Sequence, residues 1–334
     1  SLKKRRDLAI KVFQKSNKFK LIIPDGGIYM FIRILDKIDG DNFAKILLKK
    51  DFVCICPGSS FGSTYKQYFR INLAGNILEL KKGLNKIVSF FDWYFMPTKK
   101  KSDILIEFLA NQGIDDIFIV YGAANGDLVD AFTRLKDKTK YTSFMHEQAA
   151  GFAAEAYYKV KNIPGVAIAT SGPGGQNFVT PIANCFYDSV PCIFITGQVK
   201  TQFQKPSPNI RQIGFQETDI VDISKSVTKY CKMILPDDDF IQEIKKAYIE
   251  ALTGRPGPIL LDIPMDVQKQ VINYDEKSIQ KIQFQQSFNE QDIRKKIKNF
   301  LHDLASSKRP VVLAGGGVRT SNAILEFQNL FEKL

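Results

Sequence analysis

Short apolar runs alternate with longer stretches of mixed polarity from about residue 100 to residue 268. Residues 117–122, 166–169, 195–199 and 261–264 are examples of these runs. Apolar runs of this length are typical of strands that are buried on both faces of a parallel sheet. Because strands alternate with stretches of helical length, the pattern predicts an α/β fold, a doubly wound and mainly parallel sheet.

The first 95 residues have a different pattern, which predicts a small α+β unit. Its expected elements are a helix at 8–13, a turn and strand at 24–31, a strand and turn at 53–58, a strand at 68–74 and a helix at 77–90. The last helix has an apolar side made of Leu78, Leu80, Leu84, Ile87 and Val88.

The remaining elements follow from local composition. We expect an amphipathic helix at 103–112, a loop at 200–214, a helix that starts at the acidic run 236–239, a Lys-rich helix at 292–305 and a further βα unit from 309. The resulting domain boundaries are 1–95, 96–268, a polar linker at 269–290 and the start of another domain at 291–334.

Composition excludes several classes of protein. The chain has 334 residues, 44% of them apolar, which is enough for two domains. We expect no transmembrane helix, no secretory signal and a cytoplasmic location. The five cysteines form no CxxC pair and the chain has two histidines, so we expect no metal site built from its own residues.

The net charge of +12 is concentrated at the beginning of the chain. Residues 1–96 hold 18 Lys or Arg against 8 Asp or Glu, whereas residues 97–334 hold 29 against 27. The lysine runs lack the interleaved aromatic residues of a nucleic-acid-binding face. We therefore interpret them as solvated surface and expect no nucleic-acid partner.

The stretch 144–191 carries the candidate chemistry. Glu147 opens a helix rich in Ala and Gly, and the strand 166–169 runs through a glycine turn at 170–175 into Asn177. A Glu in a first helical turn usually serves the cap and the helix dipole, and a glycine turn alone is common in α/β folds. The order and spacing of the later motifs add specificity, and these motifs lie at 195–199, 215–220, 228–229, 253–258 and 261–264.

This series resembles the pyrimidine-binding, N-terminal domain of thiamine-diphosphate enzymes of the acetolactate synthase type. The resemblance implies that Glu147 is the catalytic carboxylate, hydrogen-bonded to a ring nitrogen of the aminopyrimidine, where it favours the imino tautomer. Enclosure of Glu147 among Ala and Gly side chains would raise its pKa and let it share a proton. His146 beside it is expected to orient or cap rather than to bind a metal.

The same resemblance implies the other site residues. The cofactor-binding residues would be Gly122, Gly172, Pro173, Gly174, Asn177 and Gln198. Phe215 and Gln216 would face the substrate, a small 2-oxo acid, in the neighbouring subunit's active site, so the enzyme would be a homo-oligomer, at least a dimer. The diphosphate and its Mg²⁺ would bind to a domain outside this sequence, and we therefore expect this fragment alone to be inactive.

Residues 1–95 resemble the C-terminal small domain of fold-type-I, pyridoxal-phosphate (PLP) aminotransferases. The resemblance rests on Pro-Gly-Ser-Ser-Phe-Gly at 57–62 and Phe-Arg-Ile-Asn-Leu-Ala at 69–74. It implies that Arg70 pairs with a substrate carboxylate, a role that suits a guanidinium fork. The alternative is an arginine that extends from an edge strand into solvent.

The PLP-binding part of such an enzyme would precede residue 1, so we expect this segment to be a remnant that cannot transaminate. Met96 has the character of a natural start, and we hypothesise that two neighbouring reading frames are joined here. Residues 309–319 resemble the start of the family's central domain. That domain holds FAD in some members, and it keeps its fold without flavin in others.

Three departures from acetolactate synthases bear on the reaction. Tyr121 replaces the proline of Val-Pro-Gly, Met265 replaces the lysine of Ile-Pro-Lys-Asp, and the loop at 200–214 is longer. These features look more like the enzymes found beside surface-sugar genes, which can add a two-carbon unit to a keto sugar. We therefore expect a pyruvate decarboxylase and carboligase of that kind. The alternatives are an acetolactate synthase of branched-chain amino acid biosynthesis, an inactive aminotransferase remnant and a non-catalytic scaffold.

Overall fold

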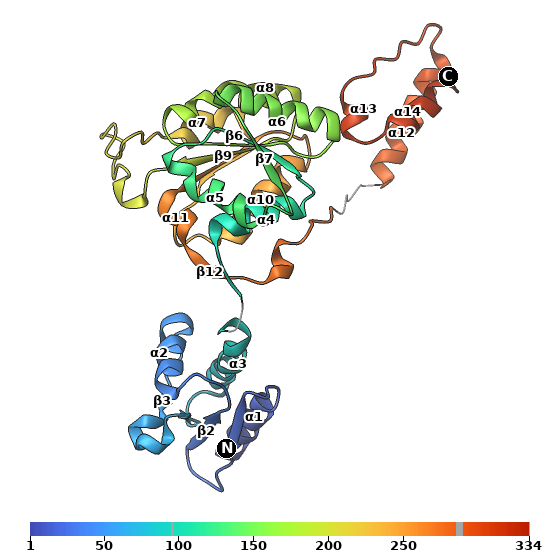
Figure 1. Ribbon diagram of the computed structural model, residues 1–334. Coiled ribbons are helices and arrows are strands. Elements are labelled where there is room, and N and C mark those ends of the chain that lie inside the picture. The colour runs from blue at the N-terminus through green and yellow to red at the C-terminus, as the bar shows by residue number, and fades with distance from the viewer. Residues whose placement is uncertain (95–96, 285–289, 334) are drawn as a thin grey trace. The chain divides into compact units, whose positions relative to one another are not determined.

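The computed structural model describes residues 1–94, 97–284 and 290–333, and it divides the chain into two compact units (Figure 1). The first unit comprises Ser1–Thr98 and Asn273–Asp275. The second comprises Lys99–Ile272 and Glu276–Leu334. The proposed start at Met96 and part of the predicted linker, residues 285–289, lie outside the described residues.

The first unit is a four-stranded antiparallel sheet packed against helices. The strand order is β1-β2-β4-β3, with β1 at Phe19–Ile22, β2 at Tyr29–Ile34, β4 at Tyr68–Asn72 and β3 at Cys56–Pro57. The helices are α1 (Leu2–Phe13), α2 (Gly40–Asp51) and α3 (Ile77–Tyr94), with the 3-10 turns η1 (Gly58–Phe61) and η2 (Ser63–Tyr65). Phe43 of α2 and Phe90 of α3 pack edge to face at 4.6 Å within a single aromatic-rich core.

The predictions for this unit hold with four differences. Strand β1 and helix α2 were not predicted, and only Cys56 and Pro57 of the expected strand at 53–58 pair with a neighbour. Leu78, expected on the apolar side of its helix, is 67% exposed. The part of this helix that packs into the core begins at Leu80 and Leu84.

The second unit contains the predicted parallel sheet. Its six strands have the order β10-β11-β9-β8-β6-β7, and every neighbouring pair is parallel. The strands are β6 (Asp116–Ile119), β7 (Lys140–Ser143), β8 (Val166–Ala169), β9 (Ile193–Gln198), β10 (Tyr230–Met233) and β11 (Ile259–Pro264). The three central strands β8, β9 and β11 are buried at every position, as the unbroken apolar runs predict.

Helices cover both faces of this sheet. One face carries α6 (Glu147–Lys161), α7 (Pro173–Asn177) and α8 (Val179–Asp188), and the other carries α4 (Lys101–Asn111), α5 (Gly126–Arg134), α10 (Phe240–Leu252) and α11 (Met265–Lys269) (Figure 1). The shorter elements are β5 (Thr98–Lys100), η3 (Ala123–Asn125), η4 (Thr201–Phe203), α9 (Ile220–Ser224), η5 (Lys225–Val227), β12 (Val271–Asn273) and η6 (Glu276–Ile279). The predicted doubly wound α/β fold is confirmed.

Helix α4 is not amphipathic, contrary to the prediction. All its residues from Lys101 to Leu109 are buried, including charged ones, because each charge has a partner. Glu107 accepts hydrogen bonds from Lys99 and Lys138, and Asp103 pairs with Arg134. Periodicity of apolar residues alone cannot reveal such pairing.

The described part of the predicted linker contains regular structure, the turn η6. Ile279 of η6 is 1% exposed, and its carbonyl oxygen accepts a hydrogen bond from Asn111 of α4 at 3.0 Å. The polar composition of this segment therefore did not indicate that one of its apolar residues, Ile279, is buried.

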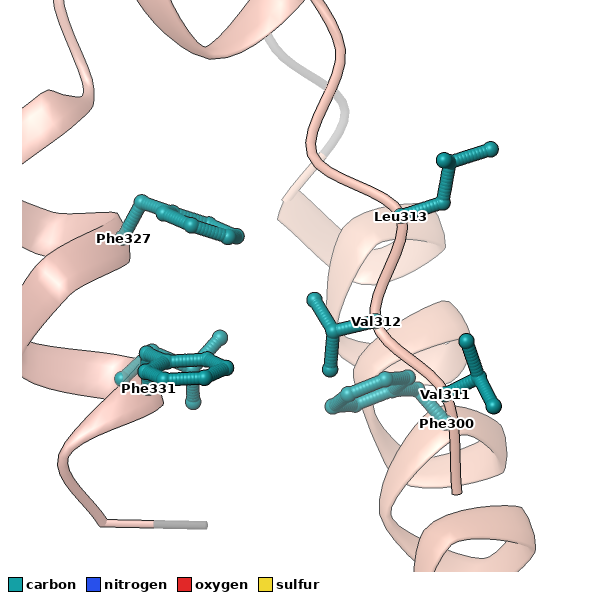
Figure 2. Close-up of a pocket in the computed structure, with 7 residues that line it drawn as sticks. Phe300, Val311, Val312, Leu313, Phe327 and Phe331 are labelled. Carbon is teal, nitrogen blue, oxygen red and sulfur yellow. The ribbon is translucent and has the colours of Figure 1, made fainter.

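The last described segment holds α12 (Glu290–Ser306), α13 (Gly317–Thr320) and α14 (Ile324–Phe331). The strand expected before the three glycines is absent, and Val311 and Leu313 are 91% and 95% exposed. No described strand pairs with them, and an isolated strand has no hydrogen-bonding partner for its backbone. Instead Phe300, Val312 and Phe331 border an apolar hollow of about 280 Å³ (Figure 2).

Gly197 allows the turn η3 to approach strand β9, and substitution of this glycine tests the packing of η3 on the strand. A Cβ at Gly197 would overlap the carbonyl group of Ala124. Gly197→Ala should lower the free energy of unfolding of this unit by about 2 kcal/mol or more, measured by urea denaturation. Gly126→Ala is the matched control, since Gly126 has helical φ and its nearest neighbour lies at 3.9 Å. Equal stability of the two variants would contradict the packing.

Candidate functional site

The candidate residues of the second unit gather where the parallel strands end. Strand β6 leads to Gly122, β7 leads to Glu147, and β8 leads to the glycine turn 170–175. The carboxyl ends of parallel strands lie at one edge of the sheet, which is where ligands bind in open α/β folds. The sheet topology therefore brings three separate segments to one place.

Glu147 lies at the first position of α6 and is partly buried. Its Oε2 accepts a hydrogen bond of 2.8 Å from Nδ2 of Asn177, the last residue of α7. His146 caps the same helix, because its Nδ1 accepts a hydrogen bond from the backbone N–H of Gln148 at 3.2 Å. The carboxylate is thus oriented by Asn177, but it is less enclosed than the surrounding Ala and Gly residues led us to expect.

Glycines leave bare backbone beside this carboxylate. A Cβ at Gly174 would lie 3.4 Å from Oε1 of Glu147 and 2.9 Å from the methyl group of Thr170. A Cβ at Gly122 would lie 2.5 Å from Cβ of Thr170. The Thr170 hydroxyl also accepts a hydrogen bond from the backbone N–H of Ala124 at 3.1 Å. The loops after β6 and β8 therefore meet at Thr170.

Thr170 was not among the predicted site residues. Its position, one residue after a fully buried strand, was the available signal, because side chains at that point lie at the carboxyl edge of the sheet.

Phe215 and Gln216 lie next to the glycine turn. Gly172 has φ +63°, and a Cβ there would lie 2.8 Å from Cβ of Gln216 and 2.9 Å from its carbonyl oxygen. Phe215 is 85% exposed. Pro173 occupies the first turn of α7, where its missing N–H leaves no hydrogen bond unmade.

Gln198 lies in a buried network and not on the surface beside Glu147. Its Nε2 donates to the Thr218 carbonyl oxygen at 2.8 Å and to Oδ2 of Asp262 at 2.9 Å, and its Oε1 accepts from the N–H of Val199. Asp262 also accepts a hydrogen bond from the Thr196 hydroxyl at 2.7 Å. Both ends of the Gln198 amide are thus hydrogen-bonded inside the protein. Its predicted contact with a cofactor stays a prediction.

Burial is the main influence on the pKa of the Asp262 carboxyl. It raises the pKa of this carboxyl to about 7, although hydrogen bonds from Thr196 and Gln198 act in the opposite direction. Asp262 was not among the predicted site residues, because its partners lie 64 and 66 residues away along the chain.

Arg70 belongs to the first unit. It lies in β4, which has β2 on one side and β3 on the other, so the alternative of an arginine on an edge strand is wrong. Its guanidinium carbon lies 3.9 Å from the ring centroid of Tyr29 and 4.9 Å from that of Phe61. Two aromatic rings therefore hold the guanidinium in place.

The residues around Glu147 fit one half of thiamine diphosphate. A flat aminopyrimidine ring needs a carboxylate at one edge and a wall without side chains, and Glu147 and Gly174 supply these. A diphosphate held by Mg²⁺ needs several oxygen ligands. Within residues 1–94, 97–284 and 290–333 no three His, Cys, Asp or Glu side chains cluster as a metal site would require. In the same ranges no helix is long and apolar enough to cross a membrane.

Comparison with known proteins agrees with this geometry. Residues 99–223 match the family described as thiamine pyrophosphate enzyme, N-terminal TPP binding domain. These residues belong to that family of N-terminal domains, and the chain is similar to acetolactate synthases. Residues 1–87 match aminotransferase class I and II, so the aminotransferase resemblance of the first unit is confirmed as well.

The relatives of this acetolactate-synthase-like chain include plant enzymes. It is 35% identical over 225 residues to acetolactate synthase 1, chloroplastic, of Nicotiana tabacum, a match that covers 67% of the chain and 33% of that protein. It is 37% identical over 230 residues to acetolactate synthase 2, chloroplastic, of Zea mays, covering 69% of the chain and 35% of that protein. The chain therefore spans about a third of the length of these relatives.

The buried carboxyl of Asp262 predicts a specific dependence of stability on pH. Its pKa is 3.8 when exposed and about 7 in the folded protein, so between these values the folded state holds a proton that the unfolded state releases. The free energy of unfolding should then fall by roughly 1.4 kcal/mol per pH unit as the pH rises through that window. Urea denaturation between pH 4.5 and 7.5 measures the slope.

Asp262→Asn should remove most of this slope, because asparagine does not titrate. Asp222→Asn, which changes an exposed carboxyl of α9, should preserve it. An unchanged slope in Asp262→Asn would show that the carboxyl is already ionised throughout that range in the folded protein.

Proposed function

We propose that the polypeptide containing this chain is a thiamine-diphosphate-dependent decarboxylase and carboligase of 2-oxo acids, with pyruvate as the two-carbon donor. The observation that carries the proposal is the Glu147 carboxylate, held by Asn177 beside bare glycine backbone at the carboxyl edge of the sheet. A scaffold that had lost catalysis would have no need to orient this carboxylate.

The residues of this chain would bind and polarise the cofactor. When bound, thiamine diphosphate supplies the electron sink for cleavage of the bond next to the keto group. Glu147 would hold a proton at one carboxyl oxygen for a ring nitrogen of the aminopyrimidine, while the hydrogen bond from Asn177 fixes the other oxygen. Gly122, Gly172 and Gly174 would form the wall against which the ring lies.

We propose further that the working enzyme is a homo-oligomer whose sites lie between subunits. Large apolar side chains flank the carboxyl edge of the sheet in an exposed state: Tyr121 is 66%, Met145 100% and Phe215 85% exposed. Such exposure around a candidate site supports a partner surface. A second subunit would also bring the diphosphate and Mg²⁺ ligands.

The acceptor we propose is a keto sugar, as in surface polysaccharide synthesis. Met265 places an apolar side chain where acetolactate synthases have a cation, and Asp266 after it is engaged by the N–H and hydroxyl of Thr201. The loop at 200–214 adds Lys200, Lys205 and Arg211 and no acidic residue, which suits an acceptor that carries phosphate. Acetolactate synthesis is the second candidate, supported by the relatives' names.

For the first unit we propose that Arg70 pairs with a carboxylate. The support is its contact with the Tyr29 and Phe61 rings, which hold in place a guanidinium whose fork suits a bidentate carboxylate. The domain boundaries at 95, 268 and 290, the cytoplasmic location and any flavin at residues 315–317 stay predictions.

Replacing the carboxylate tests the function. Glu147→Gln keeps the size of the side chain but cannot exchange a proton, so thiamine-dependent decarboxylation of pyruvate by the whole polypeptide should fall by about 10²-fold or more. Asp222→Asn is the matched control for loss of one acidic group in the same unit. Full activity in Glu147→Gln would overturn the proposal.

The acceptor is tested separately, with pyruvate as donor and either a second pyruvate or a nucleotide-linked keto sugar as acceptor. We expect the value of kcat/KM for the sugar to exceed that for pyruvate by at least tenfold. The reverse ranking would favour acetolactate synthesis while leaving the role of Glu147 intact.

A further inference from the structure

The connection from β9 to α9, residues 199–219, is long, and η4 is its only regular element among the described residues. Ordered loops of this length in a compact domain are uncommon and often functional. The buried Glu217, which is 8% exposed, lies near the end of this loop. No part of the proposed reaction uses its carboxylate.

The Glu217 carboxylate joins two separate parts of the loop. Oε1 accepts a hydrogen bond from the backbone N–H of Lys205 at 2.6 Å. Oε2 accepts from the N–H groups of Ile213 at 2.8 Å and Gly214 at 3.3 Å. One carboxylate therefore accepts hydrogen bonds from three backbone N–H groups. These bonds close the segment between Lys205 and Ile213 into a ring.

The same carboxylate supports a strained turn. The N–H of Glu217 donates to the carbonyl oxygen of Gly214 at 3.0 Å, which makes residues 214–217 a β-turn. Gln216 occupies the third position of this turn with φ +63°. Glycine or asparagine is usual where φ is positive, and residues held there against their preference cluster at functional sites.

This turn is in contact with the candidate site. The Cβ and carbonyl oxygen of Gln216 lie against Gly172, so no side chain fits at residue 172. The Gly172 carbonyl oxygen accepts a hydrogen bond from the N–H of Gln176 at 3.0 Å, in the helix that ends at Asn177. A continuous set of contacts thus runs from Glu217 through the turn and α7 to the partner of Glu147.

We propose that Glu217 is a positioning residue: it holds the strained turn of Phe215 and Gln216 against Gly172 and thereby fixes Asn177 beside Glu147. That Phe215 and Gln216 face a substrate rests on the proposed function. The mechanical coupling from Glu217 to Asn177 does not, and it is measurable in this chain without cofactor or substrate.

Trypsin reports on the order of the loop. Arg211 is exposed and lies inside the ring that Glu217 closes, whereas the bond after Lys205 precedes a proline and resists trypsin. Glu217→Gln should raise the rate of cleavage after Arg211 at least tenfold. Asp219→Asn, which removes only a 3.5 Å pair with Lys205, should change that rate less than twofold.

The side-chain amide signals of Asn177 in nitrogen-15 NMR distinguish positioning from simple loop stability. They should shift in Glu217→Gln and stay in place in Asp219→Asn. Adding Gln216→Gly to Glu217→Gln removes the cost of the positive φ and should restore the protection of Arg211. Unchanged Asn177 signals in Glu217→Gln, or no rescue by Gln216→Gly, would overturn the proposal.

If Glu217→Gln does not fold, Glu217→Asp replaces it, since the shorter side chain keeps the charge but cannot reach both parts of the loop. The same increase in cleavage and the same Asn177 shift are then required. If the unaltered polypeptide does not decarboxylate pyruvate, that result counts against the proposed function and not against the role of Glu217. Neither trypsin cleavage nor the Asn177 signals depend on catalysis.

Discussion

The hydrogen bond from Asn177 to Glu147 is the contact on which the candidate site depends. It joins the helix that follows β8 to the helix that follows β7, so two segments that are distant in the sequence orient one carboxylate. Gly174 brings no side chain beside this carboxylate, and a Cβ there would lie 3.4 Å from Oε1 of Glu147. The amide donor stabilises one carboxylate oxygen and leaves the other beside bare backbone.

Close packing of the sheet and its helices surrounds this arrangement. Gly151 lies on α6 where a Cβ would be 2.5 Å from the ring of Pro181 on α8, so the small residues of α6 allow the two helices to touch. The central strands are buried at every position, which leaves the carboxyl edge as the place where polar groups can meet a ligand. The site therefore lies at the edge of a sheet whose central strands are fully buried.

The local sequence pattern was sufficient to predict many helices and strands, but not the contacts that these elements make with one another. The run 166–169 was predicted with its observed bounds, because a strand buried on both faces is apolar throughout. The helix predicted at 103–112 is present as α4, but its amphipathic character was wrong, because Glu107 and Asp103 pair with cations on other elements. The segment at 311–313 shows the converse: its apolar residues are typical of a strand, yet no described strand pairs with it.

The candidate site likewise contains residues that motifs predict and residues that only the folded structure reveals. Glu147, Gly122, Gly174 and Asn177 could be named from motifs, and the structure brings them together. Thr170, Asp262 and Glu217 could not, because their roles arise from contacts with residues remote in sequence or from a folded loop. Gln198 was expected at the cofactor; its amide donates to Asp262 and Thr218, and contact with a cofactor stays a prediction. Burial and hydrogen-bond partners depend on the tertiary fold.

The central claim is that Glu147 acts on the proton chemistry of a bound thiamine diphosphate. The most direct test is NMR measurement of hydrogen exchange at C2 of the cofactor's thiazolium ring, bound to the whole polypeptide with Mg²⁺. The account predicts that Glu147→Gln slows this exchange by about 10²-fold or more while the cofactor still binds. Exchange at the unaltered rate in Glu147→Gln, with the cofactor bound, would contradict it.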